Sequence, residues 1–280
     1  MAPSHSTGGK FLRPAEGWLV LGSALLFLIQ TVGAQTVVPA VSVSDYASTA
    51  WDGAVSVLTA PLHWDGTAWL EVGGATVAVV GTAALVDKPL RDAARRSHAS
   101  VEERFANKFE DFGAGYSFGV LGAFYLDGLV VHNDRAKLVA EDGLTASIVS
   151  GGITDILKEA WGRARPEANK GTLDFFAYRG NASFPSGHAT QAFAVASVIA
   201  AHYGDNPWID VASYGVASLV AMARIDHDAH FASDVLAGAI IGTAVGRAVV
   251  RHRAAGRHRH VSLAPVVGGA WNGLVLDLSF

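Results

Sequence analysis

Three short groups of residues in the C-terminal half carry side chains suited to chemistry on a phosphate-like anion. In order, they are Lys158 to Arg165-Pro166, then Pro185-Ser186-Gly187-His188, and then Arg224 to His230 and Asp234. Arginine and lysine bind phosphate oxygens, and an imidazole can attack as a nucleophile or transfer a proton. The three groups therefore predict a site that holds an oxyanion and attacks it from a histidine.

The third group contains a histidine and a carboxylate at helical spacing. His230 and Asp234 are four residues apart, so they share one face if a helix begins near His230. The carboxylate can then accept from one ring nitrogen and leave the other as a nucleophile. Arg224, just before them, can grip two phosphate oxygens. Taken alone, the pair is more typical of a helix surface and the arginine of a solvated helix end.

The second group has the composition of a helix start. Pro185 and Ser186 suit the first positions, and Gly187 allows a ligand to approach the backbone. Backbone N–H groups at such a start bind anions, with the serine hydroxyl assisting, and His188 can protonate a leaving group. In isolation, the same residues are more typical of a serine-capped helix with an incidental histidine.

The first group places two cations around the end of an apolar segment. Burying the charged ammonium of Lys158 there costs free energy unless it is paired. Either a bound phosphate or Asp155, one turn earlier, can pair with it. Arg163 is expected to be solvated. All three groups together favour a phosphate site, and the chain has no Walker loop or dinucleotide fingerprint.

Long apolar segments predict an all-α fold. They span 72–86, 113–131, 144–160, 189–203, 209–224 and 234–250. Their lengths suit helices packed in a bundle with the site at the helix ends. Residues 35–70 are expected to be irregular or partly helical, and Pro89 lies in a charged break. Alternating residues over 274–280 permit a short C-terminal β-hairpin with Val261–Val267.

Composition narrows the classes of function. Of 280 residues, 50% are hydrophobic and 16% charged, so membrane contact must be considered. A net charge of -4 gives no general attraction to nucleic acid. The absence of cysteine excludes disulfides, thiolate metal sites and a thiol nucleophile.

The N-terminus resembles a secretory signal. Lys10 and Arg13 precede an apolar run, and small residues end at Ala34. The chain is therefore expected to be exported and periplasmic, either soluble or peripheral to the inner membrane. An integral inner-membrane protein is the alternative. Only 113–131 approaches the 20 residues of a spanning helix, and the other segments are closer to the length of core helices.

Four regions are expected along the chain. They are a signal peptide or anchor (1–34), a variable helical lead-in (35–99), a core that carries the three groups (100–250), and a basic tail with the hairpin (251–280).

The three groups resemble the motifs of the type 2 phosphatidic acid phosphatase and vanadium haloperoxidase superfamily, which includes bacterial class A acid phosphatases. The family pattern is Lys, six residues, Arg-Pro; then Pro-Ser-Gly-His; then Ser-Arg, five residues, His, three residues, Asp. The resemblance covers about residues 100–250. The chain departs from the pattern at Ala223, where the family usually has serine.

This resemblance implies a helical fold and a division of roles. His230 would form a phosphohistidine, Asp234 would orient it, and His188 would act as acid and then as base. The phosphate oxygens would be held by Lys158, Arg165, Arg224, Ser186 and Gly187. No metal or other cofactor is implied, although vanadate can occupy the phosphate position. Ala223 removes one hydroxyl that could bond the substrate or Arg224.

Several alternatives remain open at this stage. Vanadate-dependent halide oxidation and non-catalytic binding of phosphate or lipid heads in the envelope compete with hydrolysis. Asp226, His227 and Asp228 could bind a metal, or the two carboxylates could weaken binding of highly anionic substrates. The expected partner is a phosphorylated small molecule or a lipid phosphate, with a membrane surface but no nucleic acid. The sequence does not fix the oligomeric state.

The sequence does not identify the chemical group to which the phosphate is attached in the substrate. Residues 35–112 and 167–184 are expected to shape its pocket. Phe175, Phe176 and Tyr178 either line that pocket or pack in the core.

Overall fold

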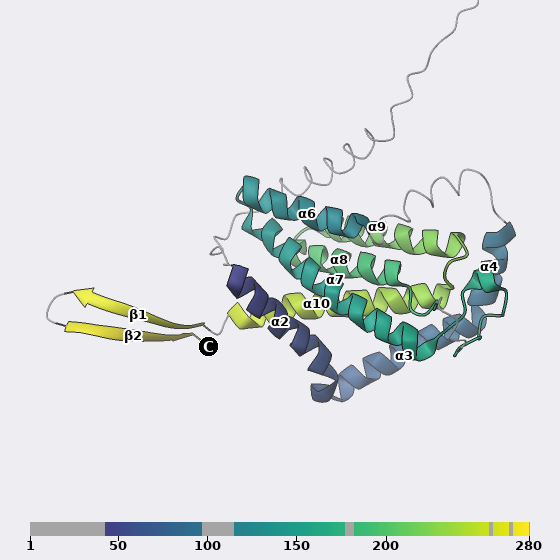
Figure 1. The fold of residues 1–280 in the computed structure, drawn as a ribbon, viewed down its shortest axis with the longest axis horizontal. Coiled ribbons are helices and arrows are strands. Elements are labelled where there is room, and N and C mark those ends of the chain that lie inside the picture. The colour runs from purple at the N-terminus through teal and green to yellow at the C-terminus, as the bar shows by residue number, and fades with distance from the viewer. Residues whose placement is uncertain (1–42, 97–114, 177–181, 258–259, 269–270, 280) are drawn as a thin grey trace, which may run out of the picture. The chain divides into compact units, whose positions relative to one another are not determined.

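The computed structural model describes residues 43–96, 115–176, 182–257, 260–268 and 271–279. Its helices are α2 (Val43–Thr59), η1 (Ala60–His63), α3 (Gly66–Leu85), α4 (Asp87–Arg96), α6 (Gly115–Val130), α7 (Asp134–Trp161), η3 (Pro166–Ala168), α8 (Gly187–Tyr203), α9 (Pro207–Asp226) and α10 (Ala232–Arg257). They form the expected all-α bundle (Figure 1). The C-terminal hairpin is also present, with β1 (His260–Gly268) paired antiparallel to β2 (Trp271–Ser279).

Each apolar segment predicted to be helical forms a helix wherever the structure describes it. The stretch around Pro89 differs from the prediction of a break, because it forms helix α4. Pro89 is in the first turn, where a backbone N–H has no intrahelical partner and a proline is tolerated. The lead-in is largely helical in its described part, since α2 and η1 together span residues 43–63.

Local capping residues set the ends of the helices. The side chain of Asn133 accepts a hydrogen bond from the N–H of Ala136 at 3.2 Å and starts α7. Asn206 caps α9 in the same way, with Pro207 at the first helical position. Gly162 ends α7 in the left-handed region at φ 48°. This turn divides the first motif into a helical half and a loop half.

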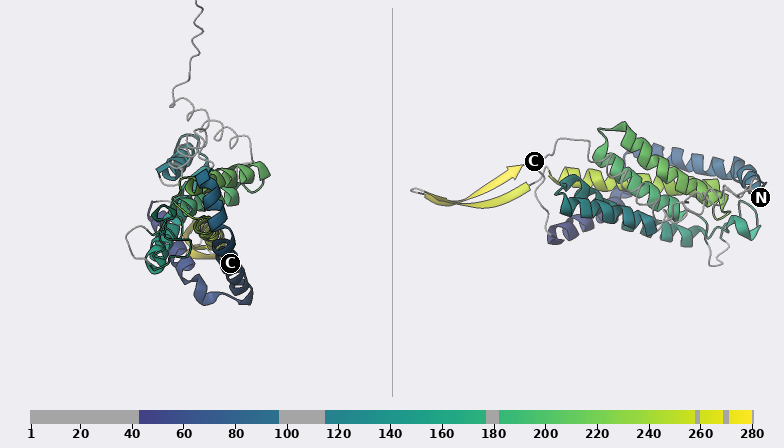
Figure 2. Two further views of the ribbon diagram at one scale, coloured as in Figure 1. Left: turned by 90° about the vertical axis from the view of Figure 1, so that its right-hand side faces the viewer. Right: turned by 90° about the horizontal axis from the view of Figure 1, so that it is seen from above.

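Helix α8 forms the centre of the bundle and packs against α7, α9 and α10 (Figures 1 and 2). Its buried contacts are made mostly by small side chains. Two clusters join it to its neighbours: Ala192, Ala196, Ala217 and Val220 between α8 and α9, and Ala189, Ala221 and Val235 among α8, α9 and α10. Small side chains let helix backbones approach closely, so the helix ends that carry the motifs are brought together.

A glycine ridge on α10 fits against α8. Gly238, Gly242 and Gly246 recur every four residues and therefore lie along one face. A Cβ atom at Gly242 would lie 2.2 Å from the carbonyl oxygen of Thr190, and one at Gly238 would lie 2.6 Å from that of Ser186. The two backbones can meet only because these residues lack side chains. This contact places the start of α10 beside the start of α8.

Replacing Gly242 by alanine is expected to destabilise the fold. The added methyl group would overlap backbone atoms of α8, and overpacking costs about 1–3 kcal/mol. Gly215→Ala is the matched control, because a Cβ there meets nothing within 4 Å, and alanine favours a helix over glycine by about 0.5–1 kcal/mol. Thermal unfolding in detergent should give a lower Tm for Gly242→Ala only. Equal Tm values would contradict the close packing.

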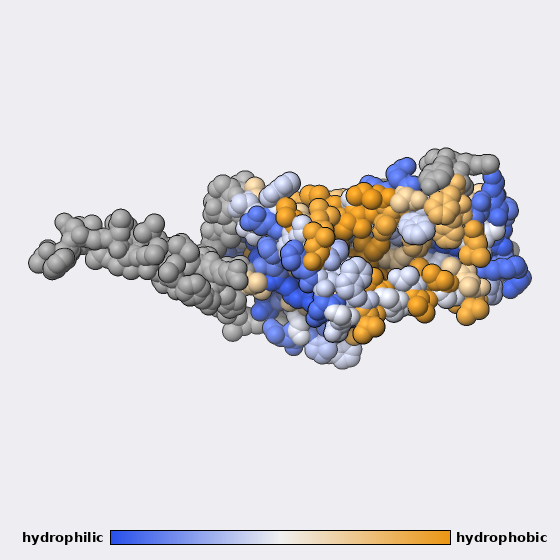
Figure 3. Space-filling model, turned by 90° about the horizontal axis from the view of Figure 1, so that it is seen from below, coloured by the Kyte–Doolittle hydropathy of each residue, from blue (hydrophilic) through white to orange (hydrophobic). Residues whose placement is uncertain are grey.

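Among the described helices, α3, α9 and α10 are long and apolar enough to cross a membrane. The expectation that 209–224 and 234–250 have core-helix length is therefore wrong, because the helices continue through flanking residues to Pro207 and to Arg257. In α3 only 6% of the apolar window is buried inside the protein. Hydrophobic side chains gather over the middle of the surface in Figure 3, between more hydrophilic ends. This surface suits membrane association.

Candidate active site at the helix ends

The three sequence motifs occupy the ends of neighbouring helices. Their residues lie as follows: Lys158 in the last turn of α7, Arg165 before η3, Ser186 and Gly187 at the start of α8, Arg224 in the last turn of α9, His230 in the loop before α10, and Asp234 in the first turn of α10. The predicted placement of the site at helix ends agrees with this arrangement.

Direct contacts join the motifs. The backbone N–H of Ser186 donates to the carbonyl oxygen of Asp234 at 2.9 Å, which links the second motif to the third. The first and second meet at Gly187, where a Cβ atom would lie 4.0 Å from Cε of Lys158. The Lys158 ammonium donates to the carbonyl oxygen of Ala182 at 3.0 Å, in the loop before the second motif. All three motifs therefore converge.

The cations lie close enough to influence one another. Burial lowers the pKa of Lys158, and the positive charges of Arg165 and Arg224 lower it further. In the described structure, Nε of Arg165 and Oγ of Ser186 are buried without a hydrogen-bond partner. An unsatisfied buried donor costs about 1–3 kcal/mol. A bound anion would satisfy both donors and compensate the charge of the three cations.

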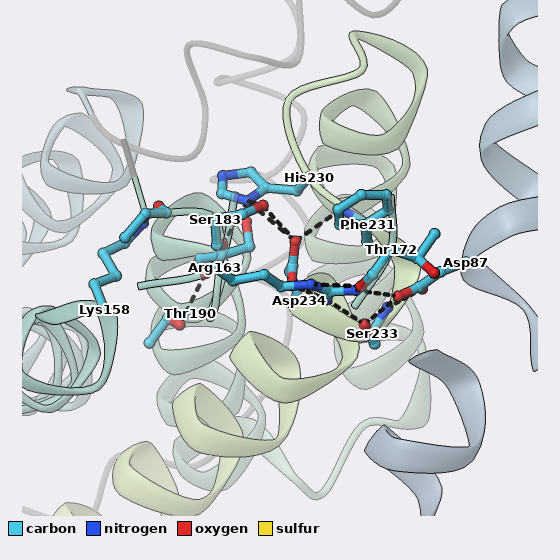
Figure 4. Close-up of polar contacts among 12 residues, drawn as sticks. Asp87, Lys158, Arg163, Thr172, Ser183, Thr190, His230, Phe231, Ser233 and Asp234 are labelled. Atoms are coloured by element: carbon cyan, nitrogen blue, oxygen red, sulfur yellow. Dashed lines mark hydrogen bonds and ion pairs between the residues drawn. The ribbon is translucent and has the colours of Figure 1, made fainter. Parts of the chain in front are cut away.

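The ring of His230 is buried and held by a backbone carbonyl. Its Nδ1 donates to the carbonyl oxygen of Ser183 at 2.8 Å, whereas Oδ2 of Asp234 is 3.8 Å from the same nitrogen (Figure 4). Asp234 therefore lies within ion-pair distance of the ring, and the nearer acceptor for Nδ1 is the Ser183 carbonyl. Since a carbonyl only accepts, Nδ1 carries the proton and Nε2 has the lone pair.

Asp234 also binds residues next to His230. Its buried carboxylate accepts from the N–H of Phe231 at 2.8 Å and from Oγ of Ser183 at 2.5 Å. It also accepts a hydrogen bond from Nη1 of Arg163. Ser183 thus binds the carboxylate with its hydroxyl and the His230 ring with its carbonyl. This double contact fixes the ring and the loop that follows it.

Arg163 is buried, which corrects the expectation that it is solvated. Its Nη1 donates to Oγ of Ser233 at 2.7 Å, and its Nη2 to Oδ2 of Asp87 at 2.7 Å. The guanidinium carbon lies 4.9 Å from the ring centre of Phe175 and 4.3 Å from that of Phe231. The carboxylates on either side and the two rings replace the water that the cation loses.

Arg95 of α4 pairs with the loop before His230. Its Nη2 lies 2.5 Å from Oδ2 of Asp228 and also donates to the carbonyl oxygen of Pro166 at 2.9 Å. This pairing compensates the charge of Asp228, so the hypothesis that Asp228 weakens anion binding loses support. The metal hypothesis for 226–228 finds none either, because the described residues contain no group of three or more metal-ligating side chains.

The remaining predicted residues are placed as follows. His188 is half-buried in the first turn of α8, and Ala223 is buried near the end of α9. Asp155 is exposed, whereas the Lys158 ammonium turns toward the loop at Ala182. The alternative in which Asp155 alone pairs with Lys158 therefore loses support.

Aromatic side chains flank the first two motifs. Trp161 has its ring centre 6.2 Å from that of Phe175, 5.9 Å from Phe176 and 6.5 Å from Phe184. Trp161 and Phe176 remain exposed, while Phe175 is half-buried against Arg163. Phe175 thus packs against Arg163, and lining of the substrate pocket by Phe176 stays a prediction. Tyr178 lies outside the described residues.

Four residues that bind the motif loops were not predicted from the sequence: Asp87, Arg95, Ser183 and Ser233. Asp87 and Arg95 belong to a charged stretch, and such a stretch usually marks a solvated face. Ser183 and Ser233 have no distinguishing pattern of their own. Only the proximity of Ser233 to Asp234 and of Ser183 to Pro185 would have given a signal.

Comparison with known proteins gives a consistent family. The PAP2 superfamily profile matches residues 143–256. The chain is 38% identical to a lipid A 1-phosphatase of Porphyromonas gingivalis over 39% of its own length and 22% of that protein. It is 37% identical to a lipid A 1-phosphatase of Rhizobium etli over 35% of its length and 43% of that protein. It therefore spans less than half of either relative.

Two solved structures resemble the chain at low sequence identity. One is a transmembrane PAP2-type phosphatidylglycerolphosphate phosphatase from Bacillus subtilis, with a TM-score of 0.48, 20% identity, and coverage of 65% of this chain and 95% of that one. The other is LpxE from Aquifex aeolicus, with a TM-score of 0.46, 22% identity, and coverage of 59% and 95%.

Proposed function

We propose that this protein is a metal-independent phosphatase that hydrolyses a lipid phosphate, because residues 143–256 match the PAP2 superfamily profile. The observation that carries the proposal is the pair of buried donors without partners, Nε of Arg165 and Oγ of Ser186. They belong to two different motifs and lie among cations beside a buried histidine. A phosphate group supplies the acceptors and the negative charge that this arrangement needs.

The proposed reaction begins with attack by Nε2 of His230 on phosphorus. A P–N bond forms, the bond from phosphorus to the leaving oxygen breaks, and His188 donates a proton to that oxygen. His188 then takes a proton from water, whose oxygen attacks phosphorus and breaks the P–N bond, so inorganic phosphate is released. The bond from Nδ1 to the Ser183 carbonyl holds His230 in the attacking tautomer.

The cations bind the charge on the phosphoryl group. Lys158, Arg165 and Arg224 hold its non-bridging oxygens, with Ser186 and the backbone at Gly187 assisting. This role explains why three positive charges lie close together. Their mutual repulsion disfavours the charged form of Lys158 and lowers its pKa. Stabilising charge at fixed, partly buried groups is the main source of acceleration in phosphoryl transfer.

The substrate class follows from the relatives and the surface together. The curated relatives are lipid A 1-phosphatases, and three described helices are apolar enough to cross a membrane. A substrate that resides in the membrane fits both observations, and a phosphorylated glycolipid is the first candidate.

A substrate panel tests the proposal. The purified protein in detergent should release phosphate from lipid A and other lipid phosphates much faster than from soluble phosphomonoesters, and EDTA should leave the rate unchanged. A requirement for an added metal would contradict the mechanism. Phosphate binding without turnover of any substrate would instead favour a binding protein.

We further propose that the bundle is an integral rather than a peripheral membrane component, with the motif ends on the exported side. An alkaline wash should leave the protein in the membrane, and detergent should release it. Because the chain lacks cysteine, single cysteines can report sidedness. Lys170→Cys marks the motif end of α8 and Asp205→Cys the other end. A membrane-impermeant maleimide added to cells should label only Lys170→Cys. Labelling of only the other variant would contradict the orientation.

The pH profile should show that His230 is neutral at physiological pH. Burial lowers its pKa, and the charges of Lys158 and Arg165 lower it further, against an opposing effect of Asp234. A lowered pKa means that the nucleophile is protonated only below the ordinary histidine value of about 6.5. We expect kcat/KM to fall on acidification with a midpoint below that value. Two substrates whose phosphates have different second pKa values should share this midpoint, and a midpoint above about 6.5 would contradict the assignment.

A further inference from the structure

We propose that helix α4, which lies outside the matched segment 143–256, supplies two positioning residues for the active site, Asp87 and Arg95. This inference rests on the proposed function of the site. Asp87 and Arg95 are about two turns apart on α4, and both contact the loops of the motifs. Lys88 and Arg91 of the same helix bond instead to Asp92, also on α4.

Arg95 fastens two loops to each other. It donates to the carbonyl oxygen of Pro166, which ends the first motif, at 2.9 Å and to Oδ1 of Asn169, just after that motif, at 2.7 Å. On its other side it binds Oδ2 of Asp228 through Nε at 3.0 Å and through Nη2 at 2.5 Å. This fork geometry suits arginine and cannot be reproduced by a point charge. The first and third motifs are thereby tied together.

The loop that Arg95 holds has an uncommon backbone. Asp228 adopts φ 53°, a left-handed conformation that is unfavourable for residues other than glycine, asparagine and aspartate. The N–H groups of Ala229 and His230 both point to the carbonyl oxygen of Arg224, each at 3.2 Å. The ion pair with Arg95 stabilises this tight turn two residues before His230.

Asp87 holds the opposite side of the same loop. Its Oδ1 accepts from the backbone N–H of Ser233 at 2.9 Å, and its Oδ2 accepts from Oγ of Ser233 at 2.6 Å. A carboxylate at this place accepts from an N–H that has no partner within α10. Its negative charge also interacts favourably with the positive end of the helix dipole. Asp87 also pairs at 2.7 Å with Arg163, which in turn binds Asp234 (Figure 4).

These contacts bracket the nucleophile. Asp228 precedes His230 by two residues and Ser233 follows it by three, and each is bonded to the same short helix. Neither Asp87 nor Arg95 is proposed to touch the substrate. A displacement of about 1 Å at a reacting group can cost about 10²-fold in rate, so this anchoring should appear in kcat rather than in KM.

The decisive comparison uses Arg95→Gln and Arg91→Gln. The two variants remove the same charge from the same helix, but only Arg95 contacts the motif loops. We expect kcat to fall about tenfold to hundredfold in Arg95→Gln, with a much smaller change in KM, and to remain unchanged in Arg91→Gln. Arg95→Lys should restore part of the loss. The kcat and KM of Asp87→Asn are compared in the same way with those of Asp92→Asn. Asp87→Glu replaces Asp87→Asn if the asparagine variant does not fold.

A double-mutant cycle and a direct readout of the loop complete the test. Arg95→Gln and Asp228→Asn should be non-additive in kcat, because each removes the same contact. Hydrogen exchange at the amides of 227–233 should accelerate in Arg95→Gln but not in Arg91→Gln, whether or not a substrate has been found. Unchanged exchange and unchanged kcat in Arg95→Gln would overturn the inference. A wild-type protein without activity on any phosphate would count against the proposed function alone, because the exchange measurement still decides the role of α4.

Discussion

Replacement of His230 by alanine is expected to abolish turnover of a lipid phosphate. In the proposed mechanism Nε2 of His230 is the nucleophile that forms the P–N bond, and no other residue takes this role. The rate should fall at least about 10³-fold, as for other nucleophiles that act in covalent catalysis. The variant should fold, because the hydrogen bonds that the structure describes for the imidazole both involve Ser183, its carbonyl at 2.8 Å and its hydroxyl at 3.4 Å. Phosphate release by purified protein in detergent measures the effect.

His63→Ala is the control for this experiment. His63 is exposed on η1, and its ring forms a hydrogen bond with the carbonyl of Thr59, four residues earlier, so its removal should leave the rate unchanged. Inorganic phosphate should still raise the Tm of His230→Ala, because the cations remain. Substantial turnover by His230→Ala would reject His230 as the nucleophile.

Replacement of Arg163 by methionine is expected to give the largest loss of stability. The change would leave Asp87 and Asp234 buried beside each other without the guanidinium that binds both. Breaking a buried ion pair by removing one partner costs about 3–5 kcal/mol, which is a large part of the stability of a typical domain. Thermal unfolding in detergent should therefore show a strong decrease in Tm, and activity should be lost with it.

Two comparisons decide whether the buried charges cause this loss. Adding Asp87→Asn to Arg163→Met removes one of the uncompensated charges, so the double variant should recover part of the Tm. Arg91→Met, which removes a half-buried arginine whose ion pair lies within α4, should have little effect. A Tm for Arg163→Met equal to that of Arg91→Met would contradict the buried network.

The helices and the composition of the site followed from the sequence because their signals are local. Apolar runs of helical length predicted α3 and α6 to α10, and motif spacing predicted which side chains would gather at their ends. The spacing of His230 and Asp234 predicted their pairing, and Oδ2 of Asp234 lies 3.8 Å from Nδ1 of His230. The nearer acceptor, the carbonyl of Ser183, is 47 residues away in the sequence, so the spacing could not reveal it.

The supports of the site could not be predicted because they depend on contacts distant in sequence. Asp87 meets Arg163 and Ser233 across 76 and 146 residues. Nothing local distinguishes Asp87 from Asp92, which forms ordinary pairs at the surface of α4, where Lys88 and Arg91 hold its pKa at about 2. Likewise, a charge between two phosphate-binding residues is usually solvated, and only the packed structure shows that Arg163 lies between two carboxylates and two aromatic rings.

The most direct test of the central claim is to trap the phosphoryl group on the enzyme. Wild-type protein and the His188→Ala variant are mixed with a labelled lipid phosphate, quenched in alkali, and mapped by mass spectrometry. The peptide 225–247 released by trypsin contains both His227 and His230, so fragmentation must separate them. We predict an acid-labile phosphohistidine at His230 that accumulates in His188→Ala, because release needs the base. Turnover with no phosphoenzyme, or with the label on another residue, would contradict the account.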